Sequence, residues 1–173
     1  PCPCGYFTDP SREWVCSPIA VERYRSKISG PLLDRIDLHV EVQSVPFKEL
    51  SGSDSMDGRG EPPPAGEGSS LLRKRVLEAR AIQEKRYQGE GGDKILCNAD
   101  LKPKQMRRFC KIDEAGRGLM ELAVERLGLS ARAYNRILKV ARTIADLAGR
   151  EAIVSSDLAE AVQYRSLDLK LFS

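Results

Sequence analysis

Residues 46–70 carry no hydrophobic periodicity, and this stretch constrains the organisation of the chain more than any other. It is rich in Gly, Ser and Pro and contains the run from Glu61 to Ser70. Such a segment cannot bury enough apolar surface to offset the conformational entropy that it would lose on ordering. We therefore expect a flexible linker over residues 46–70, which separates residues 1–45 from residues 71–173.

The part before the linker combines an irregular loop, a short helix and a strand. Residues 1–18 are rich in Cys, Pro and Gly and indicate a turn-rich loop. Apolar spacing predicts a helix from Pro18 to about Ser29, which Gly30-Pro31 breaks. Residues 36–42 then alternate strictly, and period two with β-branched members predicts a strand. Its apolar face holds Ile36, Leu38, Val40 and Val42, and its polar face holds Asp37, His39 and Glu41.

The part after the linker has helical periodicity to its end. It predicts one helix over Leu71–Gln88, one capped by Asn98, one from Asp113 to Gly128, one from Ser130 to Gly149, and one capped by Ser155 or Ser156. Five helices with short connections predict a small α-bundle. The fold class expected for the whole chain is therefore α+β and mainly α.

The composition is that of a globular chain with unevenly distributed charge. The 173 residues are 41% hydrophobic, and 28 Lys and Arg against 25 Asp and Glu give a net charge of +3. Residues 1–70 hold 7 basic and 11 acidic side chains, whereas residues 71–173 hold 21 and 14. A basic C-terminal part is compatible with nucleic acid, a nucleotide phosphate or an acidic partner, and equally with an ordinary solvated helix surface.

The sequence also predicts where the protein works. No apolar run reaches the roughly 18–20 residues of a membrane helix, and no signal peptide opens the chain. Five cysteines without a secretory signal favour reduced thiols and a cytoplasmic location. Because the chain begins at Pro1 rather than Met, we expect it to be part of a longer protein.

Two arginines are candidates for phosphate chemistry. Arg35 lies where the predicted strand begins, and its permanent planar charge suits stabilisation of a transferring phosphoryl group. The alternative for Arg35 is an ion pair with Asp34 or Asp37. Arg132 lies in the first turn of the helix capped by Ser130, where a cation opposes the helix dipole. An anion such as a nucleotide phosphate would explain that placement, whereas Arg136 and Lys139 fit ordinary surface cations of an amphipathic helix.

Long stretches of the chain resemble the magnesium-chelatase-like AAA+ ATPases of the ComM/YifB type. In the first part the resemblance is carried by residues 1–6, 16–18, 23–24 and 27–40. In the second part it is carried by residues 79–80, 83, 86, 98–99, 129–134, 136–138, 141–147 and 160–165. It covers essentially the whole chain except residues 46–70 and 88–96.

The resemblance implies specific roles. Residues 1–45 would be the C-terminal end of an AAA+ α/β core, and residues 71–173 its all-helical lid, a magnesium-chelatase-type C-terminal domain. Arg35 would be the arginine finger, which reaches the nucleotide of the adjacent subunit, and Arg132 the sensor-2 arginine, which touches the γ-phosphate. The intact protein would use ATP and Mg²⁺ and assemble as a homo-oligomer, most simply a hexamer.

The chain lacks the rest of an ATPase site. It contains no Gly-x-x-x-x-Gly-Lys-Ser/Thr phosphate loop and no acidic Walker-B strand. The resemblance implies that these parts and a sensor-1 asparagine precede Pro1. We expect the intact protein to be an ATPase and this fragment alone to be unable to hydrolyse ATP.

Three function classes remain open. The resemblance implies a DNA-acting motor, because ComM-type members are branch-migration helicases of natural transformation. A second hypothesis is the ATPase subunit of a chelatase that inserts Mg²⁺ into a porphyrin. A third is a non-enzymatic helical module that binds DNA or protein.

Three cysteines lie close together in the sequence of the N-terminal loop and are candidate thiolate ligands for Zn²⁺: Cys2, Cys4 and Cys16. The resemblance implies a second Cys-x-Cys pair, but Trp14 stands where one of the four expected ligands would be. The alternative is a degenerate site with free cysteines. Candidate fourth ligands are His39 and Asp9.

Overall fold

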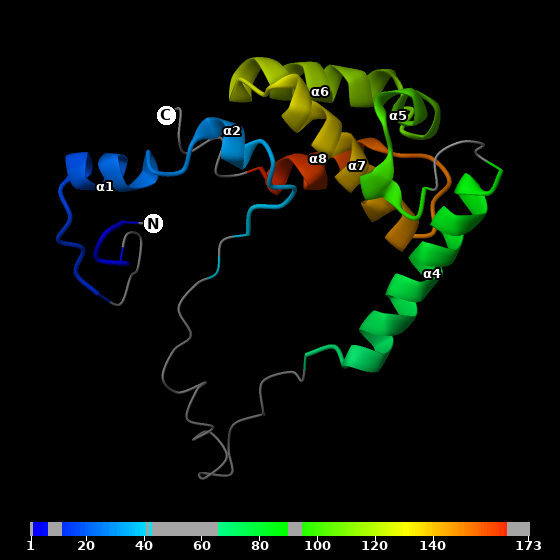
Figure 1. The fold of residues 1–173 in the computed structure, drawn as a ribbon, viewed down its shortest axis with the longest axis horizontal. Helices are drawn as coiled ribbons and strands as arrows, with labels where there is room; N and C mark the ends of the chain where they lie inside the picture. Colours follow the sequence, from blue (N-terminus) through cyan, green and yellow to red (C-terminus); the bar gives the residue numbers. More distant parts are fainter. Residues whose placement is uncertain (1, 7–11, 41, 43–65, 90–94, 166–173) are drawn as a thin grey trace, which may run out of the picture. The chain divides into compact units, whose positions relative to one another are not determined.

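The computed structural model describes residues 2–6, 12–40, 42, 66–89 and 95–165, and the regular structure in these ranges is helical (Figure 1). No strand forms within them, so the mainly helical prediction is confirmed and the α/β core stays a prediction. Of these helices, none has the length and apolarity that crossing a bilayer requires. The elements are α1 (Pro18–Arg25), α2 (Gly30–Leu33), α4 (Ser69–Tyr87), the 3-10 helix η2 (Asn98–Asp100), α5 (Pro103–Phe109), α6 (Glu114–Leu127), α7 (Ala131–Leu147) and α8 (Ser155–Gln163).

The chain divides into two compact units. The first comprises Pro1–Ser29 and Glu41–Leu71, and the second comprises Gly30–Val40 and Leu72–Ser173. The segment Gly30–Val40, which carries Arg35, is therefore part of the helical unit. Residues 46–65 of the predicted linker lie outside the described residues, and the domain division at 46–70 stays a prediction.

The strand predicted over residues 36–42 is wrong for the described positions, 36–40 and 42. The segment instead runs past the end of α8, where the His39 N–H donates to the Tyr164 carbonyl oxygen (2.7 Å). Burial in this segment is the reverse of the expected pattern. His39, from the expected polar face, is 5% exposed, whereas Leu38 and Val40, from the expected apolar face, are 47% and 69% exposed. A strand needs neighbouring strands to satisfy its backbone, and the described residues offer it none.

Most predicted helix boundaries are confirmed. α1 begins at Pro18 as expected, although it ends at Arg25. α6 follows Asp113, whose carboxylate accepts a hydrogen bond from the Gly116 N–H (2.8 Å). The same helix ends at Gly128, whose φ of 58° lies in the left-handed region that glycine adopts without strain.

Two predicted caps are wrong. Asn98 begins the 3-10 helix η2, and its buried amide bonds to other helices instead of capping α5. The last helix begins at Ser155, so no serine caps it. Val154 occupies the cap position, and the Asp157 carboxylate accepts its backbone N–H (3.0 Å). An acid in the first turn therefore takes the place of the expected hydroxyl.

The core of the helical unit surrounds α7, the helix with the clearest apolar stripe. Ala133, Ala141 and Ala145 are fully buried, and their small side chains let neighbouring helices approach. α7 packs against α8, α5 and η2, and α6 packs against α8. Burial of apolar surface at about 25 cal/mol per Å² is the main stabilising term for such a bundle. The buried apolar side chains from other elements are Tyr87, Leu101, Met106, Cys110, Met120, Ala123, Leu129, Ile153, Leu158 and Ala161.

Gly116 marks a close approach of α6 to α8. A Cβ atom there would lie 2.8 Å from Leu158 Cδ1, and Leu158 is fully buried. We expect Gly116→Ala to lower the free energy of unfolding by about 1–2 kcal/mol, because overpacking outweighs the gain in helix propensity. Gly118→Ala is the matched control, since no atom lies within 4 Å of its added Cβ, and it should be stabilising by about 0.5–1 kcal/mol. Urea denaturation measures both changes, and a stabilising Gly116→Ala would contradict the close approach.

Candidate functional site

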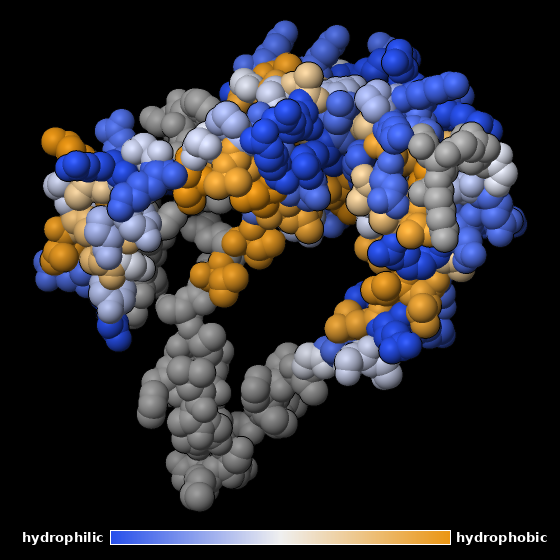
Figure 2. Space-filling view, viewed as in Figure 1, coloured by the Kyte–Doolittle hydropathy of each residue, from blue (hydrophilic) through white to orange (hydrophobic). Residues whose placement is uncertain are grey.

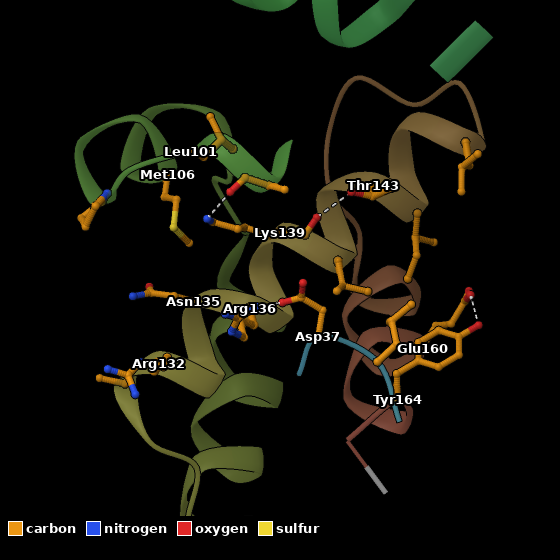
Figure 3. A pocket seen from close by; sticks show the side chains of 17 residues that line it. Asp37, Leu101, Met106, Arg132, Asn135, Arg136, Lys139, Thr143, Glu160 and Tyr164 are labelled. Carbon is orange, nitrogen blue, oxygen red and sulfur yellow. Dashed lines mark hydrogen bonds and ion pairs between the residues drawn. The ribbon is translucent and has the colours of Figure 1, made fainter. Parts of the chain in front are cut away.

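A pocket of about 900 Å³ opens beside α7 in the helical unit (Figure 3). α7 lines it together with η2, the start of α5, part of α8 and residues 37–38. This volume lies within the range of small-molecule sites, about 300–1,000 Å³. Its apolar side includes Leu101, Met106, Val140, Ile144 and Leu147, and its polar side includes Arg132, Asn135, Arg136, Lys139, Thr143 and Glu160.

The N-terminal end of α7 places Arg132 at this pocket. Ser130 caps the helix as predicted, since its hydroxyl oxygen accepts the Ala133 N–H (3.1 Å). Arg132 is therefore in the first turn, which contains no acidic residue. Its side chain is exposed and has no hydrogen-bond or ion-pair partner in the described part of the chain. The structure thus confirms where Arg132 lies, while its role stays a prediction.

Arg136 and Lys139 continue the basic face of α7 along the pocket. Arg136 forms an ion pair with Asp37, and the two side chains are 28% and 54% exposed. Lys139 donates from Nζ to the Ala99 carbonyl oxygen (2.7 Å). Both residues are thus surface cations of α7 that also have partners. Arg136 joins the segment 30–40 to α7, and Lys139 joins η2 to the same helix.

Arg35 lies just beyond α2 and is exposed. Its Nη1 donates to the Pro31 carbonyl oxygen (2.7 Å). The acids proposed as alternative partners contact other arginines, because Asp37 pairs with Arg136 and Asp34 lies 3.8 Å from Arg165. Arg35 is not among the residues that line the pocket, so the structure does not bring it together with Arg132 in one site.

Arg165 fixes the backbone on both sides of Arg35. It is fully buried, and its Nη1 donates to the carbonyl oxygens of Leu33 (3.4 Å) and Ile36 (2.5 Å). A buried guanidinium in contact with two carbonyl groups limits the motion of the turn between them. The exposed Arg35 side chain therefore projects from an anchored segment.

A buried polar network that the sequence analysis did not single out holds α7 in place. Its centre is Asp146, which is 1% exposed. Arg86 from α4 donates to both carboxylate oxygens (2.9 and 2.5 Å), Arg142 donates from Nε (3.1 Å), and the Asn98 amide donates as well (2.9 Å). The signal in the sequence was a charged pair four residues apart, Arg142 and Asp146, within an otherwise apolar helix face.

The same network reaches further elements. Arg142 is 2% exposed and donates to the carbonyl oxygens of Arg150 and Glu151 (both 2.7 Å), which fixes the connection between α7 and α8. The Tyr87 hydroxyl donates to the Asn98 side-chain oxygen (2.5 Å). Burial raises the pKa of Tyr87 to about 12, so the phenol remains a donor at neutral pH. The network thus ties α4, η2 and the connection between α7 and α8 to α7.

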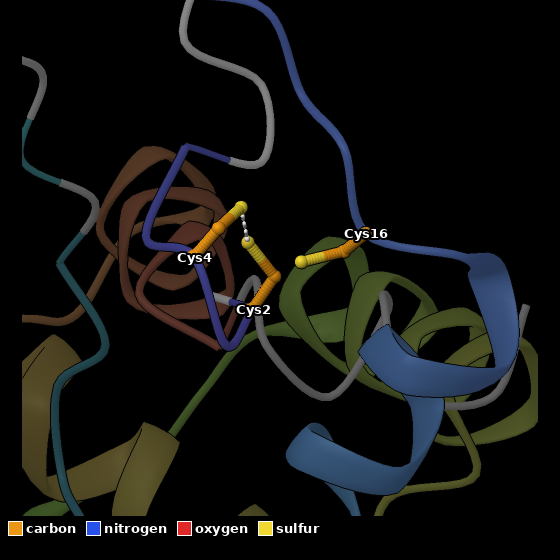
Figure 4. A group of neighbouring side chains, drawn as sticks. All are labelled: Cys2, Cys4 and Cys16. Atoms are coloured by element: carbon orange, nitrogen blue, oxygen red, sulfur yellow. Dashed lines mark hydrogen bonds between the residues drawn. The ribbon is translucent and has the colours of Figure 1, made fainter.

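The three candidate metal ligands converge in the first unit (Figure 4). The Sγ atoms of Cys2, Cys4 and Cys16 all lie within 4.8 Å of one another, and the first two are 3.1 Å apart. None of the three is in a disulfide, and hydrogen bonding to Cys4 together with partial burial raises the pKa of Cys16. Zn²⁺ binds its ligands tetrahedrally, with thiolate sulfur at about 2.3 Å from the ion. The three Sγ atoms, all within 4.8 Å of one another, are close to the spacing that thiolates around a single ion would have.

A fourth ligand is not found for this cluster among the residues that the structure describes. Asp9 lies outside them, and His39 belongs to the other unit. The described residues therefore supply three thiols, which fit three of the four positions of a zinc site.

Two family models and several curated proteins match the chain. Residues 66–165 match the model described as magnesium chelatase, subunit ChlI C-terminal, and residues 1–50 match that of magnesium chelatase, subunit ChlI. The competence protein ComM of Haemophilus influenzae is 41% identical over 167 residues, which cover 96% of this chain and 29% of that protein. YifB of Escherichia coli is 37% identical over 168 residues (97% and 30%), and Rv2897c of Mycobacterium tuberculosis is 33% identical over 165 residues (95% and 30%). The chain spans about 30% of the length of these relatives.

Proposed function

Since the chain belongs to the magnesium chelatase ChlI family of AAA+ proteins, in its ComM/YifB type, we propose that it is the C-terminal part of an ATP-dependent motor that acts on DNA. The observation that carries the nucleotide part of this proposal is Arg132. It occupies the first turn of α7 beside a ligand-sized pocket, where no acidic residue compensates it. A cation near the N-terminus of a helix interacts unfavourably with the helix dipole, and a bound phosphate would make the net electrostatic interaction favourable.

Arg35 would act as the arginine finger of the same motor. It is exposed, it projects from a turn that Arg165 anchors, and it does not line the pocket beside Arg132. These features suit a side chain that reaches the nucleotide of a neighbouring subunit in trans. The intact protein would then be a homo-oligomer, a hexamer, that requires ATP and Mg²⁺ and works in the cytoplasm.

Segment 36–42 supports an α/β core in the intact protein. Ile36, Leu38 and Val40 occupy alternate positions and are 40%, 47% and 69% exposed, and Figure 2 shows hydrophobic side chains along this segment. Apolar side chains at alternate positions are what a strand buries when a sheet is completed around it. Because this chain contains no phosphate loop, ATP hydrolysis would belong to the intact protein.

DNA is proposed as the polymer on which the motor acts for two reasons. Residues 71–173 hold 21 basic and 14 acidic side chains, and one relative is named a competence protein. The second candidate function, insertion of Mg²⁺ into a porphyrin, is favoured by the name of the matching family model. The two differ in what raises ATP turnover of the intact protein, which is DNA in the first case and a porphyrin with its partner subunits in the second.

Arg132→Ala should weaken ATP binding by the intact protein. Loss of one charge-assisted hydrogen bond of about 1.5–3 kcal/mol corresponds to an affinity lower by about 10- to 100-fold. Fluorescence titration with an ATP analogue measures this change. Arg126→Ala on α6, also exposed, is the matched control and should bind as the wild type does. Unchanged ATP affinity and turnover of Arg132→Ala would show that the residue is only a surface cation.

For the cysteine cluster we propose zinc binding. Three sulfurs within 4.8 Å of one another are the supporting observation. Elemental analysis of the intact protein purified under reducing conditions should find about one zinc per subunit, and Cys4→Ser should lower that content because one of the thiolate ligands is lost. Cys97→Ser, a cysteine outside the cluster, is the control. A wild-type content below about a tenth of an equivalent would end the metal hypothesis in favour of free cysteines.

A further inference from the structure

Residues 102–111, which contain α5, carry five basic side chains and no acidic one. Among the other helices, α6 has two basic and three acidic residues and α8 has no basic and two acidic residues, whereas α4 has six basic and two acidic residues and α7 has four basic and one acidic. Figure 2 shows hydrophilic side chains gathered over the α5 region. Positive charge thus lies on α4, α5 and α7, and of these three only the α5 segment has no acidic residue to offset it. The five residues, here called the α5 basic surface, are all exposed: Lys102, Lys104, Arg107, Arg108 and Lys111.

The inner side of α5 holds this surface firmly on the bundle. Met106 and Cys110, four residues apart, are 5% and 4% exposed. Phe109 packs edge-to-face on Tyr87 of α4, with ring centroids 5.1 Å apart. The exposed cations therefore project from a packed helix, which keeps their spacing fixed when a ligand arrives.

The acidic residues that flank this surface are engaged elsewhere. The Asp100 carboxylate accepts the backbone N–H groups of Leu96 and Cys97 (3.0 and 3.1 Å). Asp113 caps α6, and Glu114 forms an ion pair with Arg117 (2.9 Å). Lys104, Arg107 and Lys111 have no ion-pair partner among the described residues. Their charge is thus available to an external anion.

The chemistry of the surface favours a phosphate backbone over a protein partner. Protein interfaces have an apolar or aromatic centre, whereas residues 102–111, all of which are described, include no exposed large hydrophobic side chain. Single-stranded nucleic acid is bound by stacking on aromatic rings. The one ring here, Phe109, packs edge-to-face with Tyr87 and has the Arg108 guanidinium over it (4.9 Å), so it is already engaged in two contacts within the protein.

We propose that the α5 basic surface contacts the phosphate backbone of duplex DNA. This inference rests on the proposed DNA-acting function and names the surface of the lid that would perform it. Lys104 and Arg107 lie about one turn apart on α5, about 4.5 Å along its axis at the helical rise of 1.5 Å per residue, and Lys111 follows the end of the helix. One DNA strand presents a phosphate about every 3.4 Å along the axis, so the spacing of Lys104 and Arg107 suits two neighbouring phosphates. Contacts of this kind position the protein without reading sequence.

The test compares duplex-DNA binding by the intact wild type, by Lys104→Gln/Arg107→Gln, and by Arg117→Gln/Arg126→Gln. The last variant removes the same charge from the exposed surface of α6. Fluorescence anisotropy with a labelled duplex at about 50–200 mM salt gives affinity and its salt dependence. We expect the α5 variant to bind about 10- to 100-fold more weakly at 100 mM salt, with a salt slope smaller by about 1.8, because each phosphate contact contributes about 0.9. The α6 variant should stay within about twofold of wild type, since its charges make no phosphate contact.

Three outcomes would overturn the inference. The first is an α5 variant that binds duplex DNA with wild-type affinity and slope, and the second is an α6 variant that loses as much affinity. The third is tighter binding of an acidic peptide than of duplex DNA, lost in the α5 variant, which would assign the surface to a protein partner. ATP turnover separates this inference from the proposed function. If DNA stimulates the wild type and the α5 variant equally, the motor proposal stands and the α5 surface is excluded.

Discussion

Intact protein that carries Arg35→Ala is expected to hydrolyse ATP about 10³–10⁵ times more slowly than wild type, while its affinity for ATP changes little. An arginine finger stabilises charge on the transferring phosphoryl group and acts chiefly on the transition state. In the structure the Arg35 side chain makes one hydrogen bond, to the Pro31 carbonyl oxygen. Because that contact is exposed, its loss should leave the fold intact. Steady-state turnover and equilibrium ATP binding, measured on the same preparation, give the two quantities.

Two further variants sharpen this test. Arg35→Lys should remain slow, because an ammonium group cannot reproduce the planar fork of the guanidinium. Arg117→Ala removes an exposed arginine of α6 that pairs with Glu114, and it should keep wild-type turnover. Turnover of Arg35→Ala within a few-fold of that control would remove the finger assignment.

Asp146→Ala is expected to lower the free energy of unfolding by about 3–5 kcal/mol, the cost of leaving buried cations without their counter-charge. Arg142 is 2% exposed and Arg86 has a half-buried side chain, and both donate to this carboxylate. The hydrogen bond to Asp146 also raises the pKa of Arg86, which agrees with a strong pairing. Urea denaturation of the 173-residue chain, followed by circular dichroism, measures the change.

Controls keep this prediction testable if the alanine variant does not fold. Asp146→Asn retains the shape of the side chain and removes only its charge, so it should unfold at lower urea concentration than the wild type. Glu114→Ala breaks the exposed pair with Arg117 and should change stability by less than about 1 kcal/mol. Equal stability of Asp146→Asn and wild type would show that the network contributes little.

Local features were the part of the fold that sequence reasoning predicted well. The caps at Asp113 and Ser130 and the ending at Gly128 depend on a side chain or a φ angle within a few residues of the helix end. The position of Arg132 in the first turn of α7 follows directly from the Ser130 cap. Such signals are complete within one short window of sequence.

Features that depend on distant partners were predicted poorly. The alternation over residues 36–42 indicates a strand only where other strands can pair with it. Asn98 has the residue type of a helix cap, but bonds to Tyr87, Thr143 and Asp146 draw its amide into the interior. Likewise, the pairing of Arg136 with Asp37 joins residues 99 positions apart, and no local pattern indicates it.

The proposal of a DNA-driven motor is tested by ATP turnover of the intact protein, measured with and without duplex DNA. We expect that DNA raises turnover, that the increase weakens with salt as phosphate contacts do, and that Arg35→Ala abolishes the increase. A parallel measurement replaces DNA with a porphyrin and Mg²⁺, and here we expect no increase in turnover. Turnover that is unchanged by DNA and rises with the porphyrin would show that the protein is a chelatase subunit and not a DNA motor.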